Sequence, residues 1–161
     1  MALTTLDIKE PGLNTLPPGV ERYVVEGGGL TGIQILPDDE IEIINNEGNQ
    51  ICEISVFNKD GKSELAILGL KEIKDNSEIK KILFKKDETS LQALLQLKKR
   101  NLNIEKSKSS LIFDKETKAG EKIKFKSKDK CYCIIAAPGK EMIVHEQNPS
   151  TELTVMVKRS I

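Results

Sequence analysis

Alternation of apolar and polar residues marks several short β-strands in the first part of the chain. Such segments cover residues 21–26, 33–35, 40–44 and 50–57. The cluster Asn45–Asn49 holds Asn and Gly residues that tolerate a positive φ, so it predicts a tight hairpin turn between the last two of these strands. In the fourth strand Cys52, Ile54 and Val56 share a uniformly apolar face, which we expect to point into the core.

The pattern changes after Gly69, where strand alternation gives way to helical spacing. Apolar residues recur three and four positions apart at Ile79, Ile82, Leu83, Leu91, Leu94 and Leu95. Thr89 and Gln92 resemble a capping box, and Lys98–Arg100 would suit the negative end of a helix dipole. The spacing predicts one or two helices within residues 70–103.

Strand patterns resume after Ser109. They cover residues 111–113, 121–128, 131–137 and 153–158. In the segment 121–128 lysines alternate with Ile123 and Phe125, so one face is entirely Lys. This pattern is typical of an edge strand whose lysines prevent aggregation with other strand edges. The alternative is a face that binds an anionic ligand through Lys124 and Lys126.

Together these elements predict a mainly β (α+β) fold, a β-barrel or sandwich with a helical insertion. We expect a single domain over residues 1–161. It is divided into an extended lead-in (1–20), a β part (21–69), a one- or two-helix insertion (70–103) and a second β part (109–161).

Composition narrows the possible partners. Formal net charge is zero, aromatic residues make up 4% of the chain, and 22 of the 25 basic residues are Lys rather than Arg. These features argue against nucleic-acid binding, and the absence of a long apolar run or signal peptide argues against a membrane and for a cytoplasmic location. Residues 1–70 carry a net charge of −8 and residues 98–130 one of +7. The two regions could complement each other within the fold or form a homo-oligomer interface.

Two short motifs are expected to be structural. The segment Gly27–Gly32 matches the glycine pattern of dinucleotide-binding loops but precedes a strand-like run instead of a helix, so it predicts a turn. Cys131 and Cys133 lie on one face of an apolar strand. We expect them, with Cys52, to be buried and reduced, and we predict no metal site; a soft-metal site completed by Cys52 or His145 is the alternative.

His145 is the chain's single histidine, so a catalytic dyad that uses an imidazole base would have to include it. It stands where an apolar run enters a loop containing Asn148 and Pro149. The alternative is a structural or solvent-exposed histidine.

Several segments resemble the urea-carboxylase-associated family. They are Leu16–Gly19, Leu36–Ile43, Glu47–Asn58, Ala119–Ile123 and Ala136–Gly139. The resemblance implies a site built from acidic and His residues with a cysteine just before a proline, which makes Glu53 and His145 candidate catalytic residues. Gln50 lies in a matching turn and is, with Lys124 and Lys126, a candidate ligand-binding residue. Ala137 stands where the family has the cysteine, so the resemblance does not carry hydrolytic activity to this chain.

The same β domain is similar to the amino-terminal part of some glycine cleavage T-protein-like aminomethyltransferases. This resemblance implies a non-catalytic domain that docks to, or presents substrate to, an attached or separate transferase domain. Tetrahydrofolate would then bind in that other domain, with no cofactor in this chain. The alternative is a stand-alone small hydrolase or accessory protein of the urea-carboxylase-associated type.

Overall fold

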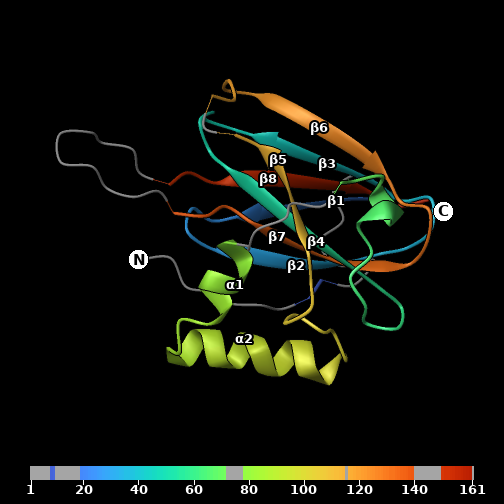
Figure 1. Cartoon of the computed structure of the whole chain (residues 1–161). Coiled ribbons are helices and arrows are strands. Elements are labelled where there is room, and N and C mark those ends of the chain that lie inside the picture. Colours follow the sequence, from blue (N-terminus) through green and yellow to red (C-terminus); the bar gives the residue numbers. More distant parts are fainter. Residues whose placement is uncertain (1–7, 10–18, 72–77, 115, 140–149, 161) are drawn as a thin grey trace.

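Two four-stranded antiparallel sheets stack face to face in the computed structural model, which describes residues 8–9, 19–71, 78–114, 116–139 and 150–160 (Figure 1). The first sheet has the order β1-β8-β3-β6 and the second the order β2-β7-β4-β5. The strands are β1 (Val20–Val25), β2 (Leu30–Ile35), β3 (Glu40–Asn45), β4 (Cys52–Asn58), β5 (Ser109–Phe113), β6 (Glu121–Lys126), β7 (Cys131–Ala136) and β8 (Leu153–Lys158).

The strand order is that of a jelly roll, because successive strands pass between the two sheets, except β4 and β5, which pair within the second. The predicted mainly β fold is therefore confirmed, in its sandwich form. The predicted hairpin across Asn45–Asn49 is wrong: β3 pairs with β6 and β8, and β4 pairs with β5 and β7. The turn carries the chain from one sheet to the other.

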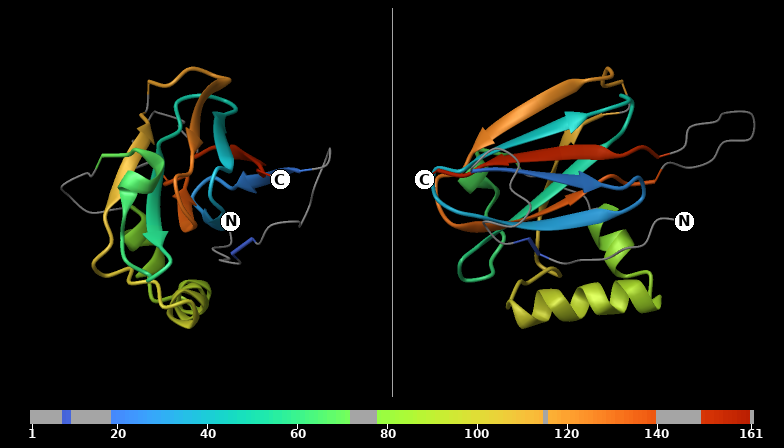
Figure 2. Two further views of the ribbon diagram at one scale, coloured as in Figure 1. Left: turned by 90° about the vertical axis from the view of Figure 1, so that its right-hand side faces the viewer. Right: turned by 180° about the vertical axis from the view of Figure 1, so that it is seen from behind.

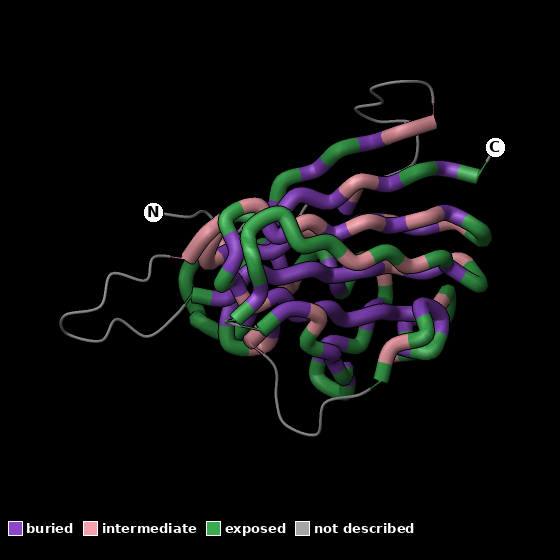
Figure 3. Tube along the Cα trace, turned by 90° about the horizontal axis from the view of Figure 1, so that it is seen from above, coloured by how far each residue is buried: buried purple, intermediate pink, exposed green. Residues whose placement is uncertain are grey.

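The main core fills the space between the sheets. Its side chains include Val25, Ile35, Ile43, Cys52, Ile54, Val56, Cys133 and Val155, all fully buried. In Figure 3 buried positions alternate with exposed or partly exposed ones along β1 and β3 of the first sheet, as expected for strands covered on one face. Cys52, Ile54 and Val56 thus face the core as predicted.

The outer face of the second sheet is covered as well, by helices α1 (Glu78–Leu83) and α2 (Glu88–Lys99) (Figure 2). Phe57 and Ile134 of the sheet pack there with Ile79, Leu83 and Leu97 of the helices. This cover explains why β4 is buried on both faces, including the face that carries Glu53. The prediction of one or two helices within residues 70–103 is confirmed, with two helices present.

Local geometry places the start and end of α2. Asp87, not Thr89, is the N-cap: its carboxylate accepts a hydrogen bond from the Ser90 N–H at 2.7 Å. At the other end Gly61 packs against the backbone of Asn101. A Cβ at position 61 would lie 1.8 Å from the Asn101 carbonyl oxygen, so only glycine permits this approach.

A short 3₁₀ helix, η1 (Leu65–Leu68), follows β4. Among the described helices, none has the length and apolar character needed to cross a membrane.

Candidate functional site

Gln50 forms a buried clamp at one end of the sandwich. Its side-chain amide donates hydrogen bonds to the carbonyl oxygens of Ile51 (2.8 Å) and Pro138 (2.9 Å). Its Oε1 atom accepts one from the Thr151 N–H at 2.8 Å. One fully buried side chain therefore ties together the end of the β7 segment and the start of the β8 segment.

Two buried oxygen atoms beside this clamp have no hydrogen-bond partner in the described part of the chain. They are Asn45 Oδ1 and Thr151 Oγ1. Asn45 is linked to the clamp through its Nδ2 atom, which donates to the Gln50 carbonyl oxygen at 2.8 Å. A buried polar atom without a partner costs free energy, so both atoms favour a water molecule or a polar group nearby. Asn45 Oδ1 can accept a hydrogen bond, and the Thr151 hydroxyl can donate or accept one. This cluster of Gln50, Asn45 and Thr151 is the candidate site, and Gln50 is the sequence-predicted residue at its centre.

Glu53, predicted as a catalytic residue, lies elsewhere and is fully engaged. Its Oε2 accepts a hydrogen bond from the Glu78 N–H at 2.8 Å, and its Oε1 accepts from the Ser109 hydroxyl at 2.6 Å and the Ile79 N–H at 3.4 Å. The carboxylate thus satisfies free N–H groups in the first turn of α1. The geometry indicates that Glu53 fixes this helix on the sheet.

Lys124 and Lys126 lie on β6, the edge strand of the first sheet. Lys126 is opposite Glu40 and Lys124 is opposite Glu42, with 3.7 Å between Lys124 Nζ and Glu42 Oε2. The lysines therefore complement acidic residues of the neighbouring strand. The clamp at Gln50 and the helix anchor at Glu53 use other partners, so the structure does not bring these four predicted residues into one site.

His145, the other predicted catalytic residue, lies outside the described residues. Within the described ranges, no group of three or more His, Cys, Asp or Glu side chains could hold a metal ion.

A buried ionic cluster at the opposite edge of the first sheet was not identified from the sequence. Arg159 donates to both oxygens of Glu21 at 2.8 and 2.9 Å and to Asp39 Oδ2 at 2.8 Å. Tyr23 donates its hydroxyl to Glu21. Burial, reinforced by the Glu21 carboxylate, raises the pKa of Tyr23. All four residues are buried, and the hydrogen bonds between Arg159 and Glu21 join the residue directly after β8 to β1.

The three cysteines are buried in the core, as predicted. Cys131 Sγ lies 3.8 Å from Cys133 Sγ and 3.7 Å from Ser127 Oγ. Hydrogen bonds from Cys133 and Ser127 lower the pKa of Cys131, whereas burial raises that of Cys52.

We expect all three thiols to be protected from alkylation in the native protein, because their accessible surface is zero. Maleimide labelling followed by mass spectrometry should find no modification of the folded chain and three modified cysteines in denaturant. Rapid labelling of Cys131 under native conditions would show that β7 opens more readily than its burial indicates.

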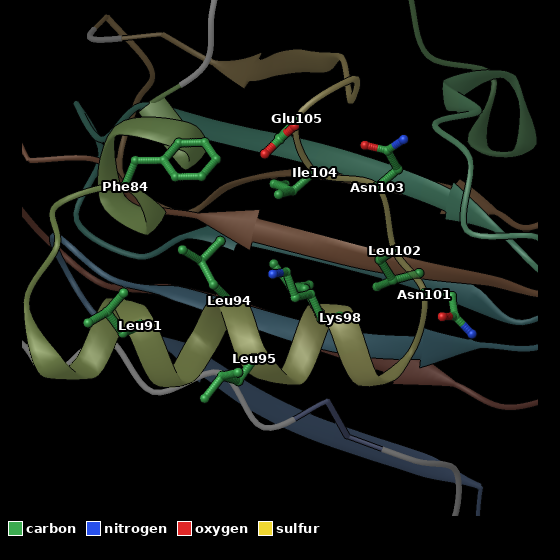
Figure 4. Close-up of a pocket in the computed structure, with 11 residues that line it drawn as sticks. Phe84, Leu91, Leu94, Leu95, Lys98, Asn101, Leu102, Asn103, Ile104 and Glu105 are labelled. Atoms are coloured by element: carbon green, nitrogen blue, oxygen red, sulfur yellow. The ribbon is translucent and has the colours of Figure 1, made fainter.

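An apolar groove runs along α2, with a volume of about 780 Å³. Figure 4 shows around it Phe84, the residue directly after α1, together with Leu91, Leu94 and Leu95 of α2 and Ile104 of the segment that follows α2. Its lining offers few groups for acid-base chemistry, so it differs in character from the polar cluster at Gln50.

No family model matches the chain. A search of curated proteins finds similarity to the trimethylamine-oxide aldolase of Ruegeria pomeroyi, with 34% identity over 155 residues. The match covers 96% of this chain, and the chain spans about a fifth of that enzyme's length (20%).

This similarity corrects one prediction from the sequence. The resemblance described above predicts the amino-terminal domain of a glycine cleavage T-protein-like aminomethyltransferase. That prediction is wrong, because the protein found to be similar is a trimethylamine-oxide aldolase and not an aminomethyltransferase. The short segments behind the expectation cover only parts of the sandwich, whereas the similarity to the aldolase extends along nearly the whole chain.

Proposed function

We propose that this chain is a β-sandwich module of an enzyme of the trimethylamine-oxide aldolase type, and that the complete enzyme acts on trimethylamine oxide. The observation that carries the proposal is the 34% identity sustained over 96% of the chain. Similarity of this extent covers nearly the whole chain, so it concerns the module and not a short local motif.

Within such an enzyme, the Gln50 cluster is the part of the described chain best suited to shape a site. The buried carboxylates of Glu21, Asp39 and Glu53 are occupied by hydrogen bonds from Arg159 or from α1. The cluster, by contrast, combines a fixed backbone with the oxygen atoms of Asn45 and Thr151 that still lack partners. We assign Gln50 a positioning role, since its own three hydrogen bonds hold the flanking backbone.

We also propose that this sandwich is related to the urea-carboxylase-associated family. It is supported by the matching segment Glu47–Asn58, which contains Gln50 and leads through β4.

A module exchange tests the function. The Ruegeria pomeroyi enzyme would be compared with a version that lacks the matched region and with a chimera that carries this chain in its place. Consumption of trimethylamine oxide is followed by the loss of its N-methyl signal in proton NMR. We expect the deletion to abolish consumption and the chimera to restore it. A chimera that is folded by circular dichroism and yet as inactive as the deletion would overturn the proposal.

Gln50→Ala in the chimera tests the positioning role. We expect a lower kcat with the chimera still folded, because the two backbone segments lose their common partner while the core is unchanged. Ser55→Ala is the matched control: it also removes a buried polar side chain of the sandwich, but Ser55 lies in the middle of β4 and its hydroxyl has no partner in the described part of the chain. Equal effects of both variants on kcat would contradict a specific role for Gln50.

A further inference from the structure

Helix α2 has a second apolar face that the described fold does not cover. Ser90, Ala93 and Leu97 are buried against the sandwich, whereas Leu91 and Leu95 are 51% and 57% exposed. Residues four positions apart are neighbours on a helix, so the two leucines form one ridge. A helix that is apolar on two sides commonly packs against two partners.

Charged residues extend this ridge at both ends. Glu88 lies three positions before Leu91, and Lys98 lies three positions after Leu95. The spacings of three, four and three place all four side chains on one face of the helix, and all four are exposed. Along the axis the order is acidic, leucine, leucine, basic.

This order is self-complementary when two helices run antiparallel. If Leu91 of one copy lies beside Leu95 of another, the same register places Glu88 beside Lys98 at both ends of the pair. Opposite charges then meet twice, and the two helix dipoles oppose each other favourably. We propose that this face of α2 is a two-fold interface between two copies of this chain.

The groove beside the ridge supports this geometry. It lies between α2, Phe84 directly after α1, and the segment around Ile104, and Phe84 is 42% exposed at its edge (Figure 4). In a two-fold pair, Leu95 of each copy enters the groove of the other, because an isologous interface repeats every contact. The exposed ridge and the open groove thereby cover each other.

Sedimentation velocity of the 161-residue chain over a wide range of concentrations tests the interface. We expect a reversible dimer, and we expect Leu95→Glu to raise its dissociation constant by at least about tenfold, because a carboxylate would enter an apolar groove. Leu111→Glu is the control: Leu111 lies on β5 and is 50% exposed, so the same substitution there should leave the dimer unchanged.

Charge reversal tests the antiparallel register. Glu88→Lys and Lys98→Glu should each weaken the dimer by about two- to fivefold, and the double variant should restore it, because each interface pair regains opposite charges. A chain that sediments as a monomer at every concentration, a dimer insensitive to Leu95→Glu, or a double variant weaker than both single variants would overturn the proposal. These measurements need no substrate, so their outcome is independent of trimethylamine-oxide consumption.

Discussion

Arg159→Ala is expected to lower the free energy of unfolding by about 3 kcal/mol or more. The change leaves the buried carboxylates of Glu21 and Asp39 without the guanidinium that now donates to both. It also removes the donor to the Gln34 carbonyl oxygen, 2.8 Å away. Urea unfolding followed by circular dichroism would measure the loss as a lower midpoint.

Two further variants test whether the loss of stability comes from the unpaired buried carboxylates. Lys158→Ala removes the exposed basic neighbour on β8 and should change the unfolding free energy by less than about 0.5 kcal/mol. Glu21→Gln combined with Arg159→Ala should recover part of the loss, because one of the unpaired buried charges is then gone. Arg159→Ala at wild-type stability would show that water reaches the carboxylates.

Glu53→Ala should destabilise the chain by about 2–3 kcal/mol, because it removes the acceptor for the Glu78 and Ile79 N–H groups and the Ser109 hydroxyl. Since α1 covers part of the second sheet, we also expect faster amide hydrogen exchange in α1 and β4. Exchange measured by mass spectrometry would locate the effect.

Ser109→Ala is the matched comparison for Glu53. It removes a single donor to the same carboxylate, so it should cost about 1 kcal/mol. The opposite result would be a Glu53→Ala chain that keeps its stability, while the chimera with the same substitution no longer consumes trimethylamine oxide. That result would support the catalytic role predicted for Glu53 from the sequence.

Along β4 the sequence identified one of the two buried faces and missed the other. Alternation placed Cys52, Ile54 and Val56 in the core correctly. It could not show that Glu53, on the opposite face of the same strand, is buried, because the helix above it is 25 residues further along the chain. A polar residue under a distant element has the same local pattern as an exposed one.

The ionic cluster did leave a signal in the sequence. Glu21 shares the strand face of Tyr23 and Val25, and Arg159 follows Val157 with the same two-residue period. Extending the alternation to these charged residues places both inward, where each needs an opposite charge. The pairing of the first strand with the last, however, follows from the jelly-roll topology and has no local signature.

The incorrect hairpin has a similar cause. Asn45–Asn49 has the composition of a tight turn, and residues of this cluster do adopt positive φ at Gly48 and Asn49. Turn composition reports backbone conformation but not whether the two flanking strands pair. Here the turn connects the two layers of the sandwich.

The position of β8 has a consequence for how the protein folds. This strand is last along the chain but lies between β1 and β3 in the first sheet. Until it is synthesised, both neighbours present unpaired apolar edges that can join strands of other chains. Pairing across such long stretches of sequence also makes folding slow. We therefore expect the nascent chain to depend on chaperones until β8 has left the ribosome.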